Sequence, residues 1–164
     1  MGKVPFGRRI GGTRRGAAVA LLCLGFALAS APAGAGLGDG ADSVQRTHLA
    51  LRGTTLTVTP HNGYDVHETV TADGARVRQY VSHTGTVFAV GWSSRTQIDL
   101  KTVLAGHYDA YVKAASIPHG ANHHVFTATT PGMVLSILKH PRGFTGTAYA
   151  PASVPAGVST GELR

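Results

Sequence analysis

Alternating apolar and polar positions predict three short antiparallel strands between residues 64 and 92. The dipeptides Asp73-Gly74 and Thr84-Gly85 interrupt the alternation and are typical of two-residue hairpin loops. With these loops, both hairpins place the same apolar residues on one face of the sheet: Val66, Val70, Val77, Val81, Phe88, Val90 and Trp92. Because a slip of one residue would turn a strand over, the agreement of the two loops favours this register.

The following segment has helical periodicity. Within residues 99–115 the apolar positions recur three or four residues apart: Leu100, Val103, Leu104, Tyr108, Tyr111, Val112 and Ala115. We expect Asp99 to cap this helix and Pro118 to end it at about Ser116. One amphipathic helix would then cover the apolar face of the sheet.

Residues 54–59 are rich in β-branched side chains and predict a fourth strand before these three. A three-residue loop at residues 61–63 would place Leu56 and Val58 on the apolar face, whereas a two-residue loop at residues 62–63 would place them outside. Burial of apolar side chains favours the longer loop.

A second hairpin is expected after the helix, with Pro131-Gly132 as its turn. This turn sets three pairs opposite each other: Phe126 with Ile137, Ala128 with Leu135, and Val125 with Leu138. Residues 144–149 predict a last strand, and an extended tail follows from Pro151. The predicted fold class is two-layer α+β: an antiparallel β-meander of about four strands covered by one amphipathic helix, followed by a C-terminal hairpin or short strands.

The first 35 residues have the pattern of a secretory signal peptide. Basic residues come first, an apolar run covers residues 17–29, and small residues follow it. We expect cleavage after Ala35, with cleavage after Ala33 as the alternative, which leaves residues 36–164 as one mature domain. The apolar run is shorter than the roughly 20 residues that span a bilayer. Cys23 follows Leu22 and not a small residue, so no stable membrane anchor is expected after cleavage.

Removing this leader changes the meaning of the composition. The chain has 15 basic and 8 acidic residues and a formal charge of +7, but five of the basic residues lie in the leader. The mature chain therefore gives little reason to expect nucleic acid as a partner. The single Cys also leaves with the leader, so the mature protein can form no internal disulfide. Two arginine pairs in the leader keep the twin-arginine route open beside the general secretory one.

Glu68 is the one weak candidate for a catalytic residue. The predicted register places its carboxylate among valines and opposite Gln79. Burial there would raise the pKa of a carboxyl group, as in a general acid or base. A structural hydrogen bond to Gln79 explains the same position and is favoured. His67, next to it, would point to the opposite face and lie beside Tyr80.

Three histidines near one another are weak candidates for metal ligands. His119, His123 and His124 fall within six residues, and neutral imidazoles suit zinc or copper. No Cys or carboxylate accompanies them, and a solvated polar loop is the favoured interpretation. No resident cofactor is predicted.

Several short motifs resemble a known family. They are Leu37-Gly38, Tyr64-x-Val66-His67-Glu68, Gly85-x-Val87-Phe88-Ala89-Val90-x-Trp92, Asp99-Leu100 and Pro155-Ala156-Gly157-Val158. Together they are similar to an uncharacterised family of exported Gram-negative bacterial proteins, a domain of unknown function, over essentially the whole mature chain. The resemblance implies a single exported domain and supplies no activity, cofactor or catalytic residue.

These observations favour a small periplasmic or secreted protein that binds another exported or envelope protein and is not an enzyme. The alternative is a transition-metal-binding module that uses His119, His123 and His124. A second alternative is a small enzyme centred on Glu68, although no Gly-x-Ser-x-Gly or comparable context is present.

Overall fold

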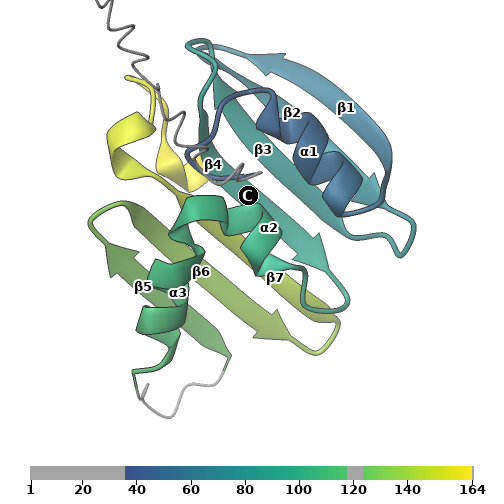
Figure 1. The fold of residues 1–164 in the computed structure, drawn as a ribbon, viewed down its shortest axis with the longest axis vertical. Coiled ribbons are helices and arrows are strands. Elements are labelled where there is room, and N and C mark those ends of the chain that lie inside the picture. The colour runs from purple at the N-terminus through teal and green to yellow at the C-terminus, as the bar shows by residue number, and fades with distance from the viewer. Residues whose placement is uncertain (1–35, 118–123, 164) are drawn as a thin grey trace, which may run out of the picture. The chain divides into compact units, whose positions relative to one another are not determined.

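A single antiparallel sheet organises the chain, in the strand order β1-β2-β3-β4-β7-β6-β5 (Figure 1). The computed structural model describes residues 36–117 and 124–163, all within the unit Ala31–Arg164. Its strands are β1 (Gly53–His61), β2 (Tyr64–Thr71), β3 (Arg76–Ser82), β4 (Val87–Ser94), β5 (Val125–Thr130), β6 (Met133–His140) and β7 (Gly143–Tyr149). Its α-helices are α1 (Ser43–Ala50), α2 (Leu100–Leu104) and α3 (Tyr108–Ala115).

The predicted α+β fold class is wrong, because the protein is mostly β. The predicted four-stranded meander does form as β1 to β4, but it is only part of the sheet. Strand β7 pairs with β4, and β6 and β5 follow, so the C-terminal hairpin extends the same sheet to seven strands. This pairing joins strands that are distant in sequence, which a local alternation pattern does not specify.

The predicted covering helix is broken into short pieces. Asp99 caps α2 as expected, since its Oδ1 accepts a hydrogen bond of 3.0 Å from Lys101 N–H. At Ala105 the backbone takes a positive φ of 48°, and the short 3₁₀ helix η1 (Ala105–His107) leads into α3. A side chain is strained in this backbone region, so the helix cannot continue through Ala105. Figure 1 shows α1, α2 and α3 over one face of the sheet.

The predicted β2–β3 register is wrong by one residue. Val70 pairs with Arg76, and Thr71 N–H donates to Ala75 O at 2.9 Å, so residues 72–74 form a three-residue loop. Gly74 takes a φ of 84°, and Thr71 Oγ1 accepts a further hydrogen bond from Ala75 N–H at 3.0 Å. These bonds fix the longer loop. Val66 and Val70 therefore face away from the helices.

The β3–β4 register is confirmed at two pairs and wrong at the third. Val77 faces Trp92 and Gln79 faces Val90, as predicted. An irregularity beyond Tyr80 then sets Val87, and not Phe88, opposite Val81. A β-bulge of this kind redirects the side chain of the extra residue. Phe88 consequently packs on the other face of the sheet.

The β1–β2 loop has two residues, since His61 pairs with Tyr64, and the predicted three-residue loop is wrong. Leu56 still packs against the helix-side core, because β2 is itself turned over relative to the prediction. Val58 is exposed. The β5–β6 register is confirmed at all three predicted pairs.

The sheet carries a hydrophobic core on each face. On the helix side a large cluster includes Leu37, Val87, Val90, Trp92, Val103, Leu104, Met133 and Leu135. On the opposite side, called the far face below, a smaller cluster contains Tyr64, Tyr80, Phe88, Ala89 and Leu163. The C-terminal residues 151–163, with the 3₁₀ turns η2 (Pro151–Ser153) and η3 (Thr160–Glu162), supply its outer side. No helix in residues 36–117 or 124–163 is long and apolar enough to cross a membrane.

Candidate ligand-binding groove

The register aligns polar side chains in rows across the far face. One row runs across all seven strands through Thr57, Glu68, Arg78, Gly91, Thr147, Ser136 and Thr127. The neighbouring row contains Thr55, Val70, Arg76, Ser93, Thr145, Leu138 and Val125. Threonine and serine on a strand face are typical of a solvated surface, and here they surround a depression.

This depression is a groove of about 440 Å³. Its lining consists of Arg76, Arg78, Gly91, Trp92, Ser93, Ser136, Leu138, Thr145, Gly146 and Thr147. Gly91 has no side chain and lies between Arg78 and Thr147 in the row. Every other position of that row carries a side chain, so Gly91 is the one position of the row where no side chain projects over the sheet.

Four hydroxyl groups of the groove are uncommitted. Ser93, Ser136, Thr145 and Thr147 make no side-chain hydrogen bond to any residue that the structure describes. A hydroxyl group can donate one hydrogen bond and accept two. The floor of the groove therefore offers both kinds of partner to a polar ligand.

An ion-pair triad forms one wall of the groove. Arg76 Nη1 donates to Glu68 Oε1 and Arg78 Nε donates to Glu68 Oε2, each at 2.7 Å. Burial raises the pKa of the Glu68 carboxyl, but the hydrogen bonds and charges of Arg78 and Arg76 lower it more, so its pKa lies below the ordinary value. Two guanidinium groups share one carboxylate, so the charges of these three described side chains sum to a net positive charge.

The predicted contact between Glu68 and Gln79 does not form. Gln79 is buried on the helix side, where its Nε2 donates to Thr47 Oγ1 at 3.2 Å. The predicted pair of His67 with Tyr80 is also wrong. The one-residue shift in the β2–β3 register sets His67 opposite Gln79. Burial lowers the pKa of His67. A catalytic role for Glu68 stays a prediction, and its arginine partners keep its carboxyl group ionised.

Arg76 and Arg78 line the groove but are not among the site residues predicted from the sequence. They alternate on one face of β3, and a three-residue β2–β3 loop would have set Arg78 directly opposite Glu68. The signal was therefore present in the charge pattern. The predicted two-residue loop did not place these arginines next to Glu68.

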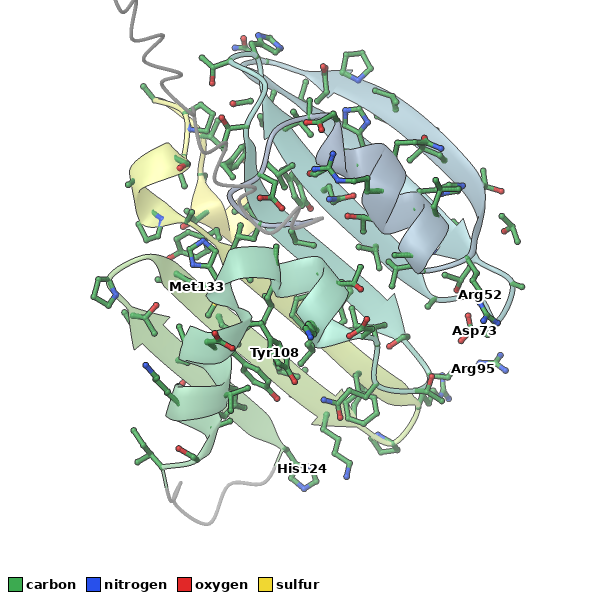
Figure 2. The ribbon with its side chains drawn as sticks, viewed as in Figure 1. Arg52, Asp73, Arg95, Tyr108, His124 and Met133 are labelled. Carbon is green, nitrogen blue, oxygen red and sulfur yellow. The ribbon has the colours of Figure 1, made fainter. Side chains whose placement is uncertain are left out.

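The metal prediction falls largely on residues outside the described part of the chain. His119 and His123 belong to the undescribed residues 118–123, and the expected cleavage positions Ala33 and Ala35 also lie outside. His124 is exposed and lines a hollow of about 250 Å³ beside Tyr111, at the edge of the sheet next to α3 (Figure 2). Among residues 36–117 and 124–163, no three His, Cys, Asp or Glu side chains gather into a metal site.

The comparison with protein families gives a match over most of the chain. The family described as "Protein of unknown function (DUF2844)" matches residues 33–163. The chain belongs to this family. The predicted resemblance to an uncharacterised family is thus confirmed, whereas its exported Gram-negative character stays a prediction. No curated protein and no solved structure matches the chain.

Proposed function

We propose that this member of the family is an exported, non-enzymatic binding module, and that its far-face groove binds an acidic oligosaccharide. The observation that carries the proposal is the groove's lining: four uncommitted hydroxyl groups beside a wall of net positive charge. Sugar hydroxyls donate and accept hydrogen bonds as serine and threonine do, and arginine binds carboxylates with both charge and geometry.

The dimensions of the groove favour an elongated ligand. Arg76 on β3 and Leu138 on β6 lie in one row, with β4 and β7 between them. Three inter-strand spacings correspond to about 14 Å. A ligand that reaches from the arginines to Leu138 would cross the strands and pass over Ser93 and Thr145.

The ionisable groups of the groove support binding over catalysis. Among the described residues that line it, only Arg76 and Arg78 have ionisable side chains. Arginine stays protonated and cannot exchange protons as a general acid or base. Glu68, beside them, is tied to both guanidinium groups. Export is supported by the basic and apolar pattern of the leader, most of which precedes the family match at residue 33.

A titration with defined sugars tests this function. A tetrasaccharide of uronic acids should bind in calorimetry, and a neutral tetrasaccharide of the same length should bind about tenfold more weakly or not at all. Gly91→Val should abolish binding because its side chain fills the groove, whereas Thr57→Val, in the same row but outside the groove, should leave affinity unchanged. Arg76→Gln should weaken binding about tenfold, and Arg142→Gln, an exposed arginine outside the lining, should not.

Three outcomes would contradict the proposal. Equal affinity for the neutral and acidic sugars would remove the role of the arginines. Full affinity of a folded Gly91→Val variant would place the ligand elsewhere. Binding of an acidic peptide in preference to the uronic acid would change the ligand class to a protein partner.

A further inference from the structure

The first described residues are held in the helix-side core. Leu37 is 1 % exposed and belongs to the main hydrophobic cluster. Its N–H donates to Val103 O at 3.2 Å, and Gly38 N–H donates to Val87 O at 2.8 Å. This segment is therefore fixed on both sides, by the end of α2 and by the start of β4.

Gly36 can be no other residue in this position. A Cβ atom placed on it would lie 2.2 Å from Val103 O and 2.8 Å from Thr102 O. Those are backbone atoms, which cannot move aside as the end of a flexible side chain can. Gly36 is itself buried, so its backbone packs directly against the carbonyl groups of α2.

A carboxylate lies next to the Gly36 nitrogen. Gly36 N–H donates to Asp39 Oδ2 at 2.9 Å, and Asp39 N–H closes the turn by donating to Gly36 O at 3.1 Å. Asp39 is half-buried, and no basic side chain in the described part of the chain forms an ion pair with it. Among the described residues, its negative charge thus lacks a cationic partner as long as the nitrogen belongs to a peptide bond.

We propose that leader cleavage after Ala35 completes this site, because it converts the Gly36 nitrogen into an α-ammonium group that pairs with Asp39. Hydrolysis adds water across the Ala35–Gly36 amide bond, leaving a carboxylate on Ala35 and an ammonium on Gly36. The hydrogen bond from an uncharged amide to the Asp39 carboxylate then becomes an ion pair, in which donor and acceptor are both charged. The inference rests on the exported character in the proposed function and is independent of the groove.

The same geometry sets the order of cleavage and docking, and the two predicted cleavage positions have different consequences for Asp39. A leader peptidase needs access to the chain on both sides of the bond that it cuts, and Gly36 and Leu37 are buried once docked. Cleavage therefore precedes docking of this segment. Cleavage after Ala33 would leave two more residues before Gly36 and place no ammonium beside Asp39.

Two recombinant forms of the mature protein test the ion pair between the Gly36 ammonium group and Asp39. One begins at Gly36 and the other carries Ala35 in front of it, each released by a protease that leaves the chosen first residue. In the wild-type protein the additional Ala35 should lower the midpoint of urea unfolding. In the Asp39→Asn variant it should leave the midpoint unchanged. Asp109→Asn, an exposed carboxylate on α3, should keep the full effect of the extension. Acylation of the Gly36 amine, followed by peptide mass mapping, should be slower in the wild type than in Asp39→Asn.

The native N-terminus separates this inference from the proposed function. Protein recovered from the producing cells should begin at Gly36. A first residue of Gly34 would overturn the inference while leaving export intact, and so would an equal effect of the extension in wild type and Asp39→Asn. An uncleaved chain in the cell would overturn the exported character itself.

Discussion

At Glu68, two opposing effects act on one carboxyl group. Its side chain is only 22 % exposed, which favours the neutral form, while two arginines at 2.7 Å favour the carboxylate. The arginines prevail, so the pKa is lower in the folded state than the ordinary value of 4.5. A carboxyl group with a lowered pKa stabilises the fold above its unfolded-state pKa, and this stabilisation is lost as pH falls through the folded-state pKa.

We therefore expect Glu68→Gln to lower the free energy of unfolding by about 1 kcal/mol or less at neutral pH, since both arginines are partly exposed and solvent screens the pair. The difference from wild type should shrink at acidic pH, as the pH falls through the lowered folded-state pKa of the wild-type carboxyl. Urea denaturation at neutral and at acidic pH measures it. Glu162→Gln, an exposed carboxylate in η3, serves as the control and should show no comparable pH dependence. A Glu68→Gln effect that persists unchanged in acid would show that the charge is not its cause.

Between β4 and β7, one glycine makes room for the only tryptophan. A Cβ atom on Gly146 would lie 2.1 Å from Trp92 Cζ2 and 2.3 Å from Cε2. Gly146 faces Trp92 in the register, and the indole ring is 5 % exposed in the helix-side core. The pairing of these two strands, which joins the two halves of the sheet, therefore depends on the absence of a side chain.

Gly146→Ala should consequently destabilise the protein by about 1–3 kcal/mol, because a buried ring has to move. Thermal or urea unfolding followed by Trp92 fluorescence measures both the stability and the environment of the ring. Gly106→Ala is the matched control, since a Cβ atom there meets nothing within 4 Å, and it should be neutral or slightly stabilising. If the two substitutions changed the free energy of unfolding equally, the close contact between Gly146 and Trp92 would not contribute to stability.

Loop length decided how far the sequence could predict the elements. Pro131-Gly132 admits one short turn between β5 and β6, and every predicted pair of that hairpin is confirmed. Asp73-Gly74 fits either a two-residue loop or the end of a three-residue loop with Gly74 at positive φ, and the hydrogen bonds of Thr71 select the second. Alternation could not decide, because both faces of β3 contain apolar side chains: Val77 and Val81 on one face, and Tyr80 on the other.

The same ambiguity in loop length explains why the groove could not be predicted from the sequence. The sequence points to Glu68 as an unusual carboxylate, but the predicted place of Glu68 opposite Gln79 is wrong. Its partners Arg76 and Arg78 appear only in the register that the structure shows. Other lining residues of the groove come from β7 and β6, and the pairing of β7 with β4 is non-local. A groove assembled from strands so distant in sequence has no local signature.

In the molecule as a whole, residues 151–163 cover the hydrophobic cluster on the far face of the sheet. Tyr64, Tyr80 and Phe88 form ring contacts with centroid distances of 5.7 to 6.2 Å on the far face. Leu163, only 2 % exposed, packs into this aromatic cluster from the C-terminal segment. The far face is thus divided into a covered apolar end and the uncovered polar groove.

Leu163→Ala should therefore cost about 2–4 kcal/mol of stability, in the range of other large-to-small substitutions at buried positions, although it lies almost at the end of the chain. Equilibrium unfolding in urea, followed by Trp92 fluorescence and by far-UV circular dichroism, gives the loss and shows whether both probes report one transition. Glu162→Ala, exposed and adjacent, should change stability by less than about 0.5 kcal/mol. If Leu163→Ala lowered the free energy of unfolding as little as Glu162→Ala, the C-terminal segment would contribute little to the stability of the fold. If the predicted loss is found, the end of the chain is as much a part of the folded unit as the central strand β4, and the polar groove is what remains open after that segment has docked.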